Sequence, residues 1–244
     1  MTSLRELRFY ATPEHACSYL PDRQARTLFL DPYAQVDRHL YSQLSELGFR
    51  RSGGHIYRPH CETCQACISV RIPVAEFQPS KTQRRIENRN RDLIVRAQPC
   101  QLTQEYYQLY ERYINQRHAD GDMYPPSREQ FCNFLVEGGT DSCFYEFREP
   151  SGKLLAVAVT DLLDQGMSAL YTFYDPESAR RSLGVYAIIW QIRQTRRIGK
   201  DWLYLGYWVE GCRKMNYKTR YRPLEMLIEG QWQRPAAESG PISF

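Results

Sequence analysis

The 244-residue sequence lacks any long apolar run. Its uninterrupted apolar stretches are short, such as Leu154 to Val159, whereas a membrane-spanning helix needs about 20 apolar residues in a row. Residues 1–15 carry Glu6 and Glu14 and have no apolar core followed by a small-residue cleavage site, which excludes a secretory signal. These absences predict a cytoplasmic protein with no membrane partner.

The sequence also has no strong excess of one charge. Its 32 Lys and Arg residues against 28 Asp and Glu residues give a formal net charge of +4. A nucleic acid would therefore have to bind a local basic patch. The G-x-x-x-x-G-K-[ST] pattern of ATP-binding phosphate loops is missing. The larger C-terminal part, from residue 103, holds a single histidine, His118, and no Cys–His or Ser–His arrangement, which disfavours a covalent intermediate.

Cysteines form the densest local pattern. Cys61, Cys64 and Cys67 follow one another at C-x2-C-x2-C spacing, and Cys17 adds a fourth thiol upstream. In a reducing cytoplasm such thiols are metal ligands or buried groups rather than disulfides. Four thiolates could hold zinc or an iron-sulfur cluster. Two alternatives stay open, namely His60 as the fourth ligand and reduced thiols packed without any metal.

Composition divides the chain into four parts. Residues 1–76 form a small cysteine-bearing N-terminal domain with a helix near Val36 to Leu47 and a strand at Cys67 to Val74. Residues 77–102 are an arginine-rich connecting segment in which Ser80 can cap a helix. Residues 103–234 form the larger domain, and residues 235–244 a loose tail.

The larger domain has helices before and after strands, which predicts an α+β fold. Thr103 can cap a helix with one apolar stripe, and Ser127 with Gln130 can start a second helix. Short turn-rich connections then separate three strands, which predicts an antiparallel meander. A helix beginning at Ser182, a strand, a helix and a final strand follow. The expected strands are residues 143–148, 153–163, 167–174, 201–209 and 224–228, and the later helices are 182–197 and 211–218.

This order of elements, with an antiparallel-rich mixed sheet, resembles the GCN5-related acyltransferases. In that fold the helix after the meander often opens with R/Q-x-x-G-x-G/A, whose backbone N–H groups hold the pyrophosphate of coenzyme A. Here Arg181 and Gly184 keep the first two positions of the pattern, but Tyr186 replaces the small residue. A phenol at that position would crowd a pyrophosphate, so coenzyme A is not the expected donor.

Several separate motifs carry a closer resemblance over nearly the whole chain. They are Asp22 to Arg26, Tyr57 to Pro59 with Cys61, Cys64 and Cys67, Tyr171 to Pro176, Ser182 to Tyr186, Tyr204 to Trp208, and Cys212 to Lys218. In this order they resemble the bacterial branch of the arginyl-tRNA:protein transferase family, the leucyl-tRNA:protein transferases. The resemblance implies a cysteine-bearing N-terminal domain followed by an acyltransferase-like C-terminal domain.

The resemblance implies an aminoacyltransferase of the N-degron pathway. Its members move leucine from leucyl-tRNA to the α-amine of proteins that begin with Asp or Glu, which marks those proteins for degradation. The implied partners are leucyl-tRNA and such acceptor proteins, with no role for DNA. Because the aminoacyl ester is already activated, the transfer requires no cofactor. An α-amine has an ordinary pKa of about 7.7 to 8.0, so a strong general base is dispensable.

Three residues are candidates for the chemistry. Tyr171 and Tyr174 lie on opposite faces of one strand by period-2 alternation, so at most one of them should point toward a given cleft. Asp161, near the end of the preceding strand, could orient the attacking amine. The alternatives are core packing for the tyrosines and a strand-end turn for Asp161. The start of the 182–197 helix, at Ser182, Gly184 and Tyr186, could hold the carbonyl oxygen or the terminal ribose.

Basic residues are candidates for substrate binding. Residues 213–222 hold five cations and no acid, interleaved with Tyr217 and Tyr221, a mixture that suits a single-stranded CCA end. A solvated helix face is the alternative for these residues. Beside the cysteines, Arg23, Arg26 and Arg58 could bind the acceptor's carboxylate. The substrate-binding candidates are Arg23, Arg26, Arg58, Ser182, Gly184, Tyr186, Tyr207, Arg213, Lys214 and Lys218.

Two functions from other classes remain open. A coenzyme A dependent N-acetyltransferase would explain the order of elements but needs the pyrophosphate cradle. A non-catalytic redox or RNA-binding protein would explain the thiols and arginines but not the acyltransferase-like order.

Overall fold

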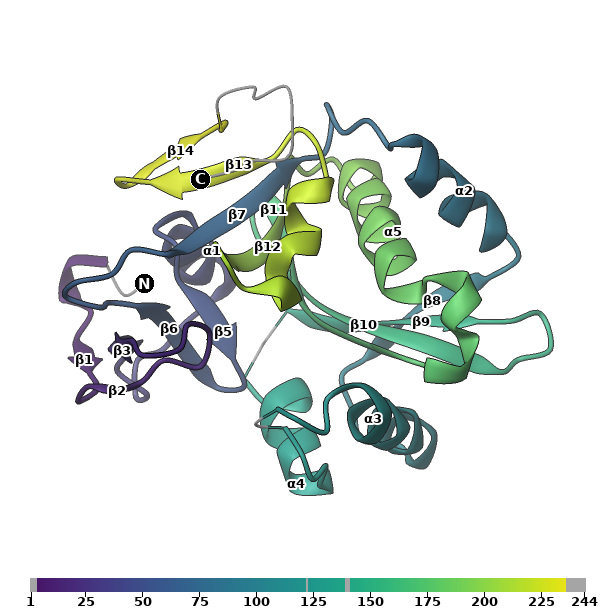
Figure 1. The fold of residues 1–244 in the computed structure, drawn as a ribbon, viewed down its shortest axis with the longest axis horizontal. Helices are drawn as coiled ribbons and strands as arrows, with labels where there is room; N and C mark the ends of the chain where they lie inside the picture. The colour runs from purple at the N-terminus through teal and green to yellow at the C-terminus, as the bar shows by residue number, and fades with distance from the viewer. Residues whose placement is uncertain (1–3, 122, 139–140, 236–244) are drawn as a thin grey trace.

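The computed structural model describes residues 4–121, 123–138 and 141–235, and Figure 1 shows their arrangement. A large mixed sheet carries helices on both faces, and a smaller sheet lies beside one end of it. The expected loose tail of residues 235–244 lies outside the described residues apart from residue 235. None of the helices in these ranges is long and apolar enough to cross a membrane.

Eight strands form the large sheet, in the order β14-β13-β7-β12-β11-β10-β9-β8. Most neighbours are antiparallel, and β11 pairs with β12 in parallel. The bounds are β7 (Cys67–Pro73), β8 (Ile94–Pro99), β9 (Ser142–Arg148), β10 (Leu154–Leu162), β11 (Gly166–Tyr174), β12 (Trp202–Val209), β13 (Glu225–Ile228) and β14 (Gln231–Gln233).

The predicted antiparallel meander is confirmed as β9, β10 and β11. β10 is the central strand, and its residues from Leu154 to Asp161 are all buried. Such a strand has no solvent face, which explains why its sequence is an almost continuous apolar run. The meander thus gives the domain a rigid centre.

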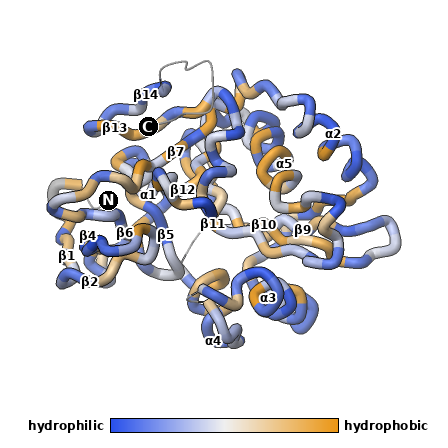
Figure 2. Tube along the Cα trace, viewed as in Figure 1, coloured by the Kyte–Doolittle hydropathy of each residue, from blue (hydrophilic) through white to orange (hydrophobic). Residues whose placement is uncertain are grey.

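Helices cover both faces of this sheet. α5 (Leu183–Arg197) packs its apolar stripe on one face, with α2 (Lys81–Arg89) outside it, and α3 (Gln104–Arg117) covers the other face with α4 (Arg128–Phe131). A π-helical segment, η2 (Cys132–Val136), continues α4. Figure 2 shows that α2 is mostly hydrophilic, as expected for a helix that has another helix between it and the sheet.

The predicted helix starts are mostly confirmed. The Ser80 side chain accepts from the backbone of Gln83 and forms a capping box at α2, and the Thr103 side chain caps α3 by accepting from the backbone N–H of Tyr106. Ser182 is different, because it has a left-handed conformation with φ of 53° and its side chain makes no capping hydrogen bond. The short segment before it is the 3-10 helix η3 (Pro176–Arg181), which the sequence did not predict.

The N-terminal segment is not confirmed as a separate cysteine domain. Its last strand, β7, lies inside the large sheet between β13 and β12, and pairs Cys67 with Val209 and Pro73 with Trp202. The predicted boundary at residue 76 therefore falls just after a strand of the larger unit. The division of the chain into domains stays a prediction.

The remaining N-terminal elements form small sheets and one helix beside the large sheet. β1-β4-β6-β5 form a four-stranded sheet and β2-β3 a two-stranded one, and α1 packs between this region and Leu163 and Tyr204. The bounds are β1 (Phe9–Ala11), β2 (His15–Ala16), β3 (Gln24–Ala25), β4 (Thr27–Leu30), α1 (Arg38–Glu46), β5 (Arg50–Ser52) and β6 (His55–Pro59), with η1 (Leu4–Glu6) before them.

The two parallel strands separate along their length. β11 and β12 pair only from Gly166 with Trp202 to Ser168 with Tyr204, although both strands continue for several residues. Gly206 then has a φ of +77°, which interrupts the regular strand. The 3-10 helix η4 (Arg213–Arg220) packs against β12, where a helix over residues 211–218 was expected. The end of β11 therefore packs against α3, whereas the end of β12 lies beside the N-terminal elements.

Candidate functional site

A cavity of about 760 Å³ lies between the N-terminal sheets and the start of β7. All four candidate metal ligands line it, as do the three arginines expected to bind a carboxylate. The residues from these two predictions are Cys17, Cys61, Cys64 and Cys67, with Arg23, Arg26 and Arg58. The structure therefore brings together two groups of residues that the sequence suggested separately.

The thiols lie close enough to influence one another electrostatically. Burial, followed by the neighbouring thiols of Cys17, Cys61, Cys64 and Cys212, raises the pKa of Cys67 to about 12. Cys212 is a fifth thiol that the sequence spacing did not reveal. As they are placed, however, no three His, Cys, Asp or Glu side chains in the described part of the chain are arranged to hold a metal ion.

The three arginines of the cavity differ in whether their side chains already have partners. Arg26 forms an ion pair with Glu62, and Arg58 lies 5.0 Å over the ring of Phe49 while donating to the carbonyl oxygen of Leu47. Arg23 is exposed on the cavity rim. Glu229 is the one acidic residue among the described residues that line the cavity, so its lining is cationic.

Tyr207, one of the substrate-binding candidates, forms part of the cavity wall. Its hydroxyl donates to the carbonyl oxygens of Gly48 and Tyr57, at 2.7 Å and 3.3 Å, and burial raises its pKa. Arg50 lies 5.9 Å over its ring and donates to Ser69, which also lines the cavity. The burial of Arg50 could not be predicted from its sequence neighbours, since nothing local distinguishes it from Arg51.

A second group of candidates meets at the start of α5. A Cβ atom on Gly184 would lie 3.1 Å from the Tyr174 ring, and that ring lies 4.8 Å from the ring of Tyr113. Tyr113 also accepts or donates a hydrogen bond of 3.0 Å to His118, whose pKa is lowered by burial and by nearby Lys214. The N–H groups that open α5 therefore lie beside a cluster of aromatic rings.

Tyr171 and Tyr174 do not point apart as period-2 alternation predicted. Both rings contact Tyr113, with centroid distances of 6.3 Å and 4.8 Å. Tyr174 is the last residue of β11, where the chain leaves the sheet, so its ring can reach around the strand end. Both tyrosines are half-buried, so packing accounts for much of what they do.

The structure corrects the expectation for Tyr186. Its side chain is buried and packs edge-on against Phe147 at 5.7 Å, so it does not stand over the start of α5. The phenol therefore cannot crowd a pyrophosphate. Another feature disfavours pyrophosphate binding at this helix start. Arg181, the basic residue of the pattern, already pairs with Asp92 at 2.9 Å and with Glu149 at 3.2 Å.

Asp161 is also placed differently from the expectation. It is 3% exposed and accepts hydrogen bonds from Arg51 at 2.6 and 2.9 Å, from Ser142 at 2.6 Å and from Tyr41 at 3.3 Å. These contacts use its carboxylate for holding β10 against the N-terminal elements. A second cavity of about 420 Å³ lies beside this ion pair, but no other candidate site residue lines it.

The basic residues of η4 fall into two classes. Arg213 and Lys214 are exposed, and Lys214 pairs with Asp120 at 2.8 Å, near His118. Lys218 is instead 7% exposed, and its ammonium donates to the carbonyl oxygen of Tyr207. Burial, followed by Arg50, lowers the pKa of Lys218 to about 8. Lys218 is therefore not placed to contact phosphates at the surface.

Two parts of the sequence match a known family. Residues 15–85 match the family described as arginine-tRNA-protein transferase, N terminus, and residues 105–228 match its C terminus. The solved structure of L-PGS from Bacillus licheniformis superposes on this protein with a TM-score of 0.46 and 13% sequence identity. The superposition covers 59% of this chain and 47% of the L-PGS chain.

Curated relatives match over almost the whole length. A protein of Pseudomonas fluorescens (strain Pf0-1) named aspartate/glutamate leucyltransferase is 61% identical over 232 residues, which are 95% of this chain and 98% of the relative. A protein of the same name from Pseudomonas aeruginosa (strain LESB58) is 60% identical over 233 residues, with the same coverage. The chain belongs to the arginine-tRNA-protein transferase family.

Proposed function

We propose that this protein transfers leucine from leucyl-tRNA to the N-terminal α-amine of proteins that begin with Asp or Glu. The observation that carries the proposal is the identity of about 60% to relatives named aspartate/glutamate leucyltransferase, over 95% of this chain. Both halves of the family pattern are present in their expected order. The cationic cavity fits an acidic acceptor.

The reaction is a direct transfer between two bound substrates. The neutral α-amine attacks the ester carbonyl of leucyl-tRNA, the new C–N bond forms, and the ester C–O bond breaks. The amine loses a proton, and the terminal ribose oxygen gains one. Because the ester is activated, the protein needs mainly to position the two reactants and to stabilise the charge on the carbonyl oxygen.

The start of α5 is the proposed place for that oxygen. The order of elements from β8 to β13 supports a GCN5-related acyltransferase arrangement, in which backbone N–H groups at this helix start contact the donor. The Ser182 side chain makes no capping contact with the helix, and Gly184 leaves room beside Tyr174. We assign Ser182 and Gly184 to the carbonyl oxygen or the terminal ribose, with Tyr171 and Tyr174 beside them.

Exposed cations of η4 are the proposed contacts for the tRNA. Lys214 pairs with Asp120 and lies near His118, which contacts Tyr113 of the aromatic cluster, and Arg213 is the neighbouring residue of η4. The exposed Tyr217 between the cations offers a ring for base stacking. This arrangement would bring the CCA end toward the start of α5.

The cysteines do not support a step of this reaction. Zinc or an iron-sulfur cluster at Cys17, Cys61, Cys64 and Cys67 stays a proposal from their spacing and shared cavity, because the thiols as placed form no set of ligands. The proposed transfer uses no cofactor. The reducing cytoplasm, proposed for the chain from its sequence, would keep these thiols reduced.

Leucine transfer can be measured directly. Purified protein is incubated with labelled leucyl-tRNA and peptides that begin with Asp, Glu or Arg. We expect label on the Asp and Glu peptides and none on the Arg peptide. Labelled arginyl-tRNA serves as the alternative donor, and transfer of arginine in place of leucine would overturn the proposed donor. No transfer from either tRNA would overturn the proposed activity.

A further inference from the structure

Two buried cations lie against Tyr207 without an acidic partner in the part of the chain that the structure describes. Arg50 is 5% exposed and Lys218 is 7% exposed. Arg50 donates to the carbonyl oxygens of Ser45 and Phe49 and to Ser69 Oγ, and its Nε has no partner. Lys218 donates to the carbonyl oxygen of Tyr207. These neutral oxygens leave both charges without a counter-ion.

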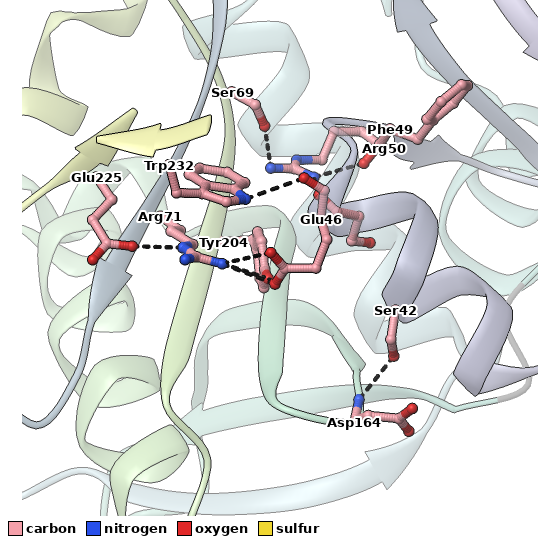
Figure 3. A network of polar contacts seen from close by, with 11 residues as sticks. Ser42, Glu46, Phe49, Arg50, Ser69, Arg71, Asp164, Tyr204, Glu225 and Trp232 are labelled. Atoms are coloured by element: carbon pink, nitrogen blue, oxygen red, sulfur yellow. Dashed lines mark hydrogen bonds and ion pairs between the residues drawn. The ribbon is translucent and has the colours of Figure 1, made fainter. Parts of the chain in front are cut away.

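Other buried arginines of this protein have carboxylate partners. Figure 3 shows Arg71 between Glu225 and Glu46, at 2.7 Å and 2.8 Å, whereas Arg50 in the same view points at Ser69 and the Phe49 carbonyl. Arg51 pairs with Asp161. A buried charge without a partner destabilises a fold strongly, so such a group beside a cavity is a candidate for binding an anionic ligand.

The net charge of this region remains positive after its neighbours are counted. The group formed by Arg71, Glu46 and Glu225 carries one net negative charge. The Tyr204 ring lies between this group and Arg50, with the guanidinium of Arg71 at 5.8 Å and that of Arg50 at 5.0 Å from the ring centroid. Arg50 and Lys218 together carry two positive charges. Their closeness is also seen in Lys218, whose pKa of about 8 is lowered by burial and then by Arg50.

This positive charge lies directly behind the wall of the larger cavity. Ser69 and Tyr207 line that cavity, Arg50 contacts both of them, and Lys218 contacts the backbone of Tyr207. Arg23, Arg26 and Arg58 line it as well, against Glu229 in the lining and Glu62 paired with Arg26. Cavity and wall together favour a small anion.

We infer that Arg50 and Lys218 are specificity residues, which favour a negatively charged first side chain in the acceptor by placing positive charge directly behind Ser69 and Tyr207 in the cavity wall. The inference rests on the proposed leucyl transfer. A carboxylate fits better than an RNA phosphate, because fixed buried cations suit a small side chain that enters a cavity, whereas phosphates along an RNA are bound by exposed cations. A neutral Asn or Gln of the same shape leaves the positive charge uncompensated, so the cavity rejects it.

Steady-state kinetics test the two residues. Leucine transfer is measured at saturating leucyl-tRNA onto matched peptides that begin with Asp or Asn, for the wild type, Arg50→Met, Arg50→Lys and Lys218→Met. Each methionine variant should raise KM for the Asp peptide by about 30-fold, with kcat changed less than about threefold. Arg50→Lys keeps the charge but loses the planar set of N–H donors that Arg50 presents, so its KM for the Asp peptide should rise less than that of Arg50→Met. The matched control is Arg193→Met, an exposed arginine paired with Glu87, which should behave as the wild type.

The outcomes separate this inference from the proposed function. An unchanged Asp-peptide KM in both methionine variants overturns the inference, while transfer by the wild type leaves the proposed function in place. A rise in KM for leucyl-tRNA with an unchanged peptide KM also overturns it, since the cations would then serve the RNA. Absence of transfer by the wild type overturns the proposed function itself.

A second measurement needs no variant that could misfold. Hydrogen exchange of the wild-type protein is followed by mass spectrometry with the Asp peptide, the Asn peptide and no peptide. Residues 60–66, several of which line the cavity, should exchange more slowly with the Asp peptide only. Residues 31–37, beside the smaller cavity, should be unaffected and serve as the internal control. Equal exchange of residues 60–66 with both peptides overturns the inference.

Discussion

The ring of Tyr174 lies directly against Gly184 at the start of α5, where a Cβ atom on Gly184 would come within 3.1 Å of Tyr174 Cε1. On its other side the same ring packs against Tyr113 at 4.8 Å, so it has little room to move. A glycine at this position therefore serves to keep Tyr174 beside the first N–H groups of the helix.

Gly184→Ala should separate stability from activity. The alanine favours the helix by about 0.5 to 1 kcal/mol, which offsets the tight contact, so the free energy of unfolding should change by less than about 1 kcal/mol. The displaced ring should lower kcat for leucine transfer by about tenfold. The control is Gly54→Ala, because a Cβ atom there would meet nothing within 4 Å. Equal activity of the two variants would remove the start of α5 from the proposed site.

Asp161→Asn should act on stability and not on catalysis. The change leaves the buried Arg51 without its counter-ion, which should cost about 3 to 5 kcal/mol in urea unfolding. Asp164→Asn is the control, since Asp164 is more exposed and should cost less than about 1 kcal/mol. Transfer per folded molecule should be unchanged. A stable Asp161→Asn variant that no longer transfers leucine would instead support the role in orienting the amine that the sequence suggested.

Lys218 should give the free protein a pH-dependent stability. Burial lowers its pKa from 10.5 to about 8 in the folded state, so above pH 8 the unfolded chain binds more protons than the folded one. The destabilising charge is fully present below the folded pKa and is lost as the pH rises through it. The free energy of unfolding of the wild type, relative to Lys218→Met, should rise by about 2 kcal/mol between about pH 7.5 and 9.5. A flat difference would mean that the ammonium is well solvated.

Changing Arg213 and Lys214 together to alanine should weaken tRNA binding. Both side chains are exposed on η4, so each can contact a phosphate and release counter-ions. The slope of log affinity against log salt should become shallower by about 1 to 2, and KM for an Asp peptide should not change. Arg193→Ala provides the exposed-arginine control. An unchanged slope would place the tRNA on another surface.

Local signals in the sequence were sufficient for most of the elements. Ser80 and Thr103 are good helix caps because their side chains accept from the next turn, and both do so. Short turn-rich links defined the meander of β9, β10 and β11, which the structure confirms. The placement of β7 between β12 and β13 could not be predicted, because a pairing such as Cys67 with Val209 joins residues far apart in the sequence.

The candidate site was only partly predictable for the same reason. Spacing and charge identified the cysteines and Arg23, Arg26 and Arg58, which do share one cavity. The neighbours Arg50 and Arg51 are indistinguishable locally, yet one faces Ser69 and the other Asp161. The burial of Tyr186 and Lys218 could not be predicted either. Tyr186 is buried against Phe147 of β9, and Lys218 against Tyr207 of β12, and these contacts arise only in the folded chain.

The choice between leucyl-tRNA and acetyl-coenzyme A as the acyl donor can be measured by offering both to one acceptor peptide. A peptide that begins with Asp is incubated with the protein, leucyl-tRNA and acetyl-coenzyme A together, and its mass is measured after the reaction. We expect the peptide to gain one leucine residue and no acetyl group, and we expect no change in its mass when the tRNA is omitted. A peptide that gains an acetyl group and no leucine would contradict the proposed leucine transfer.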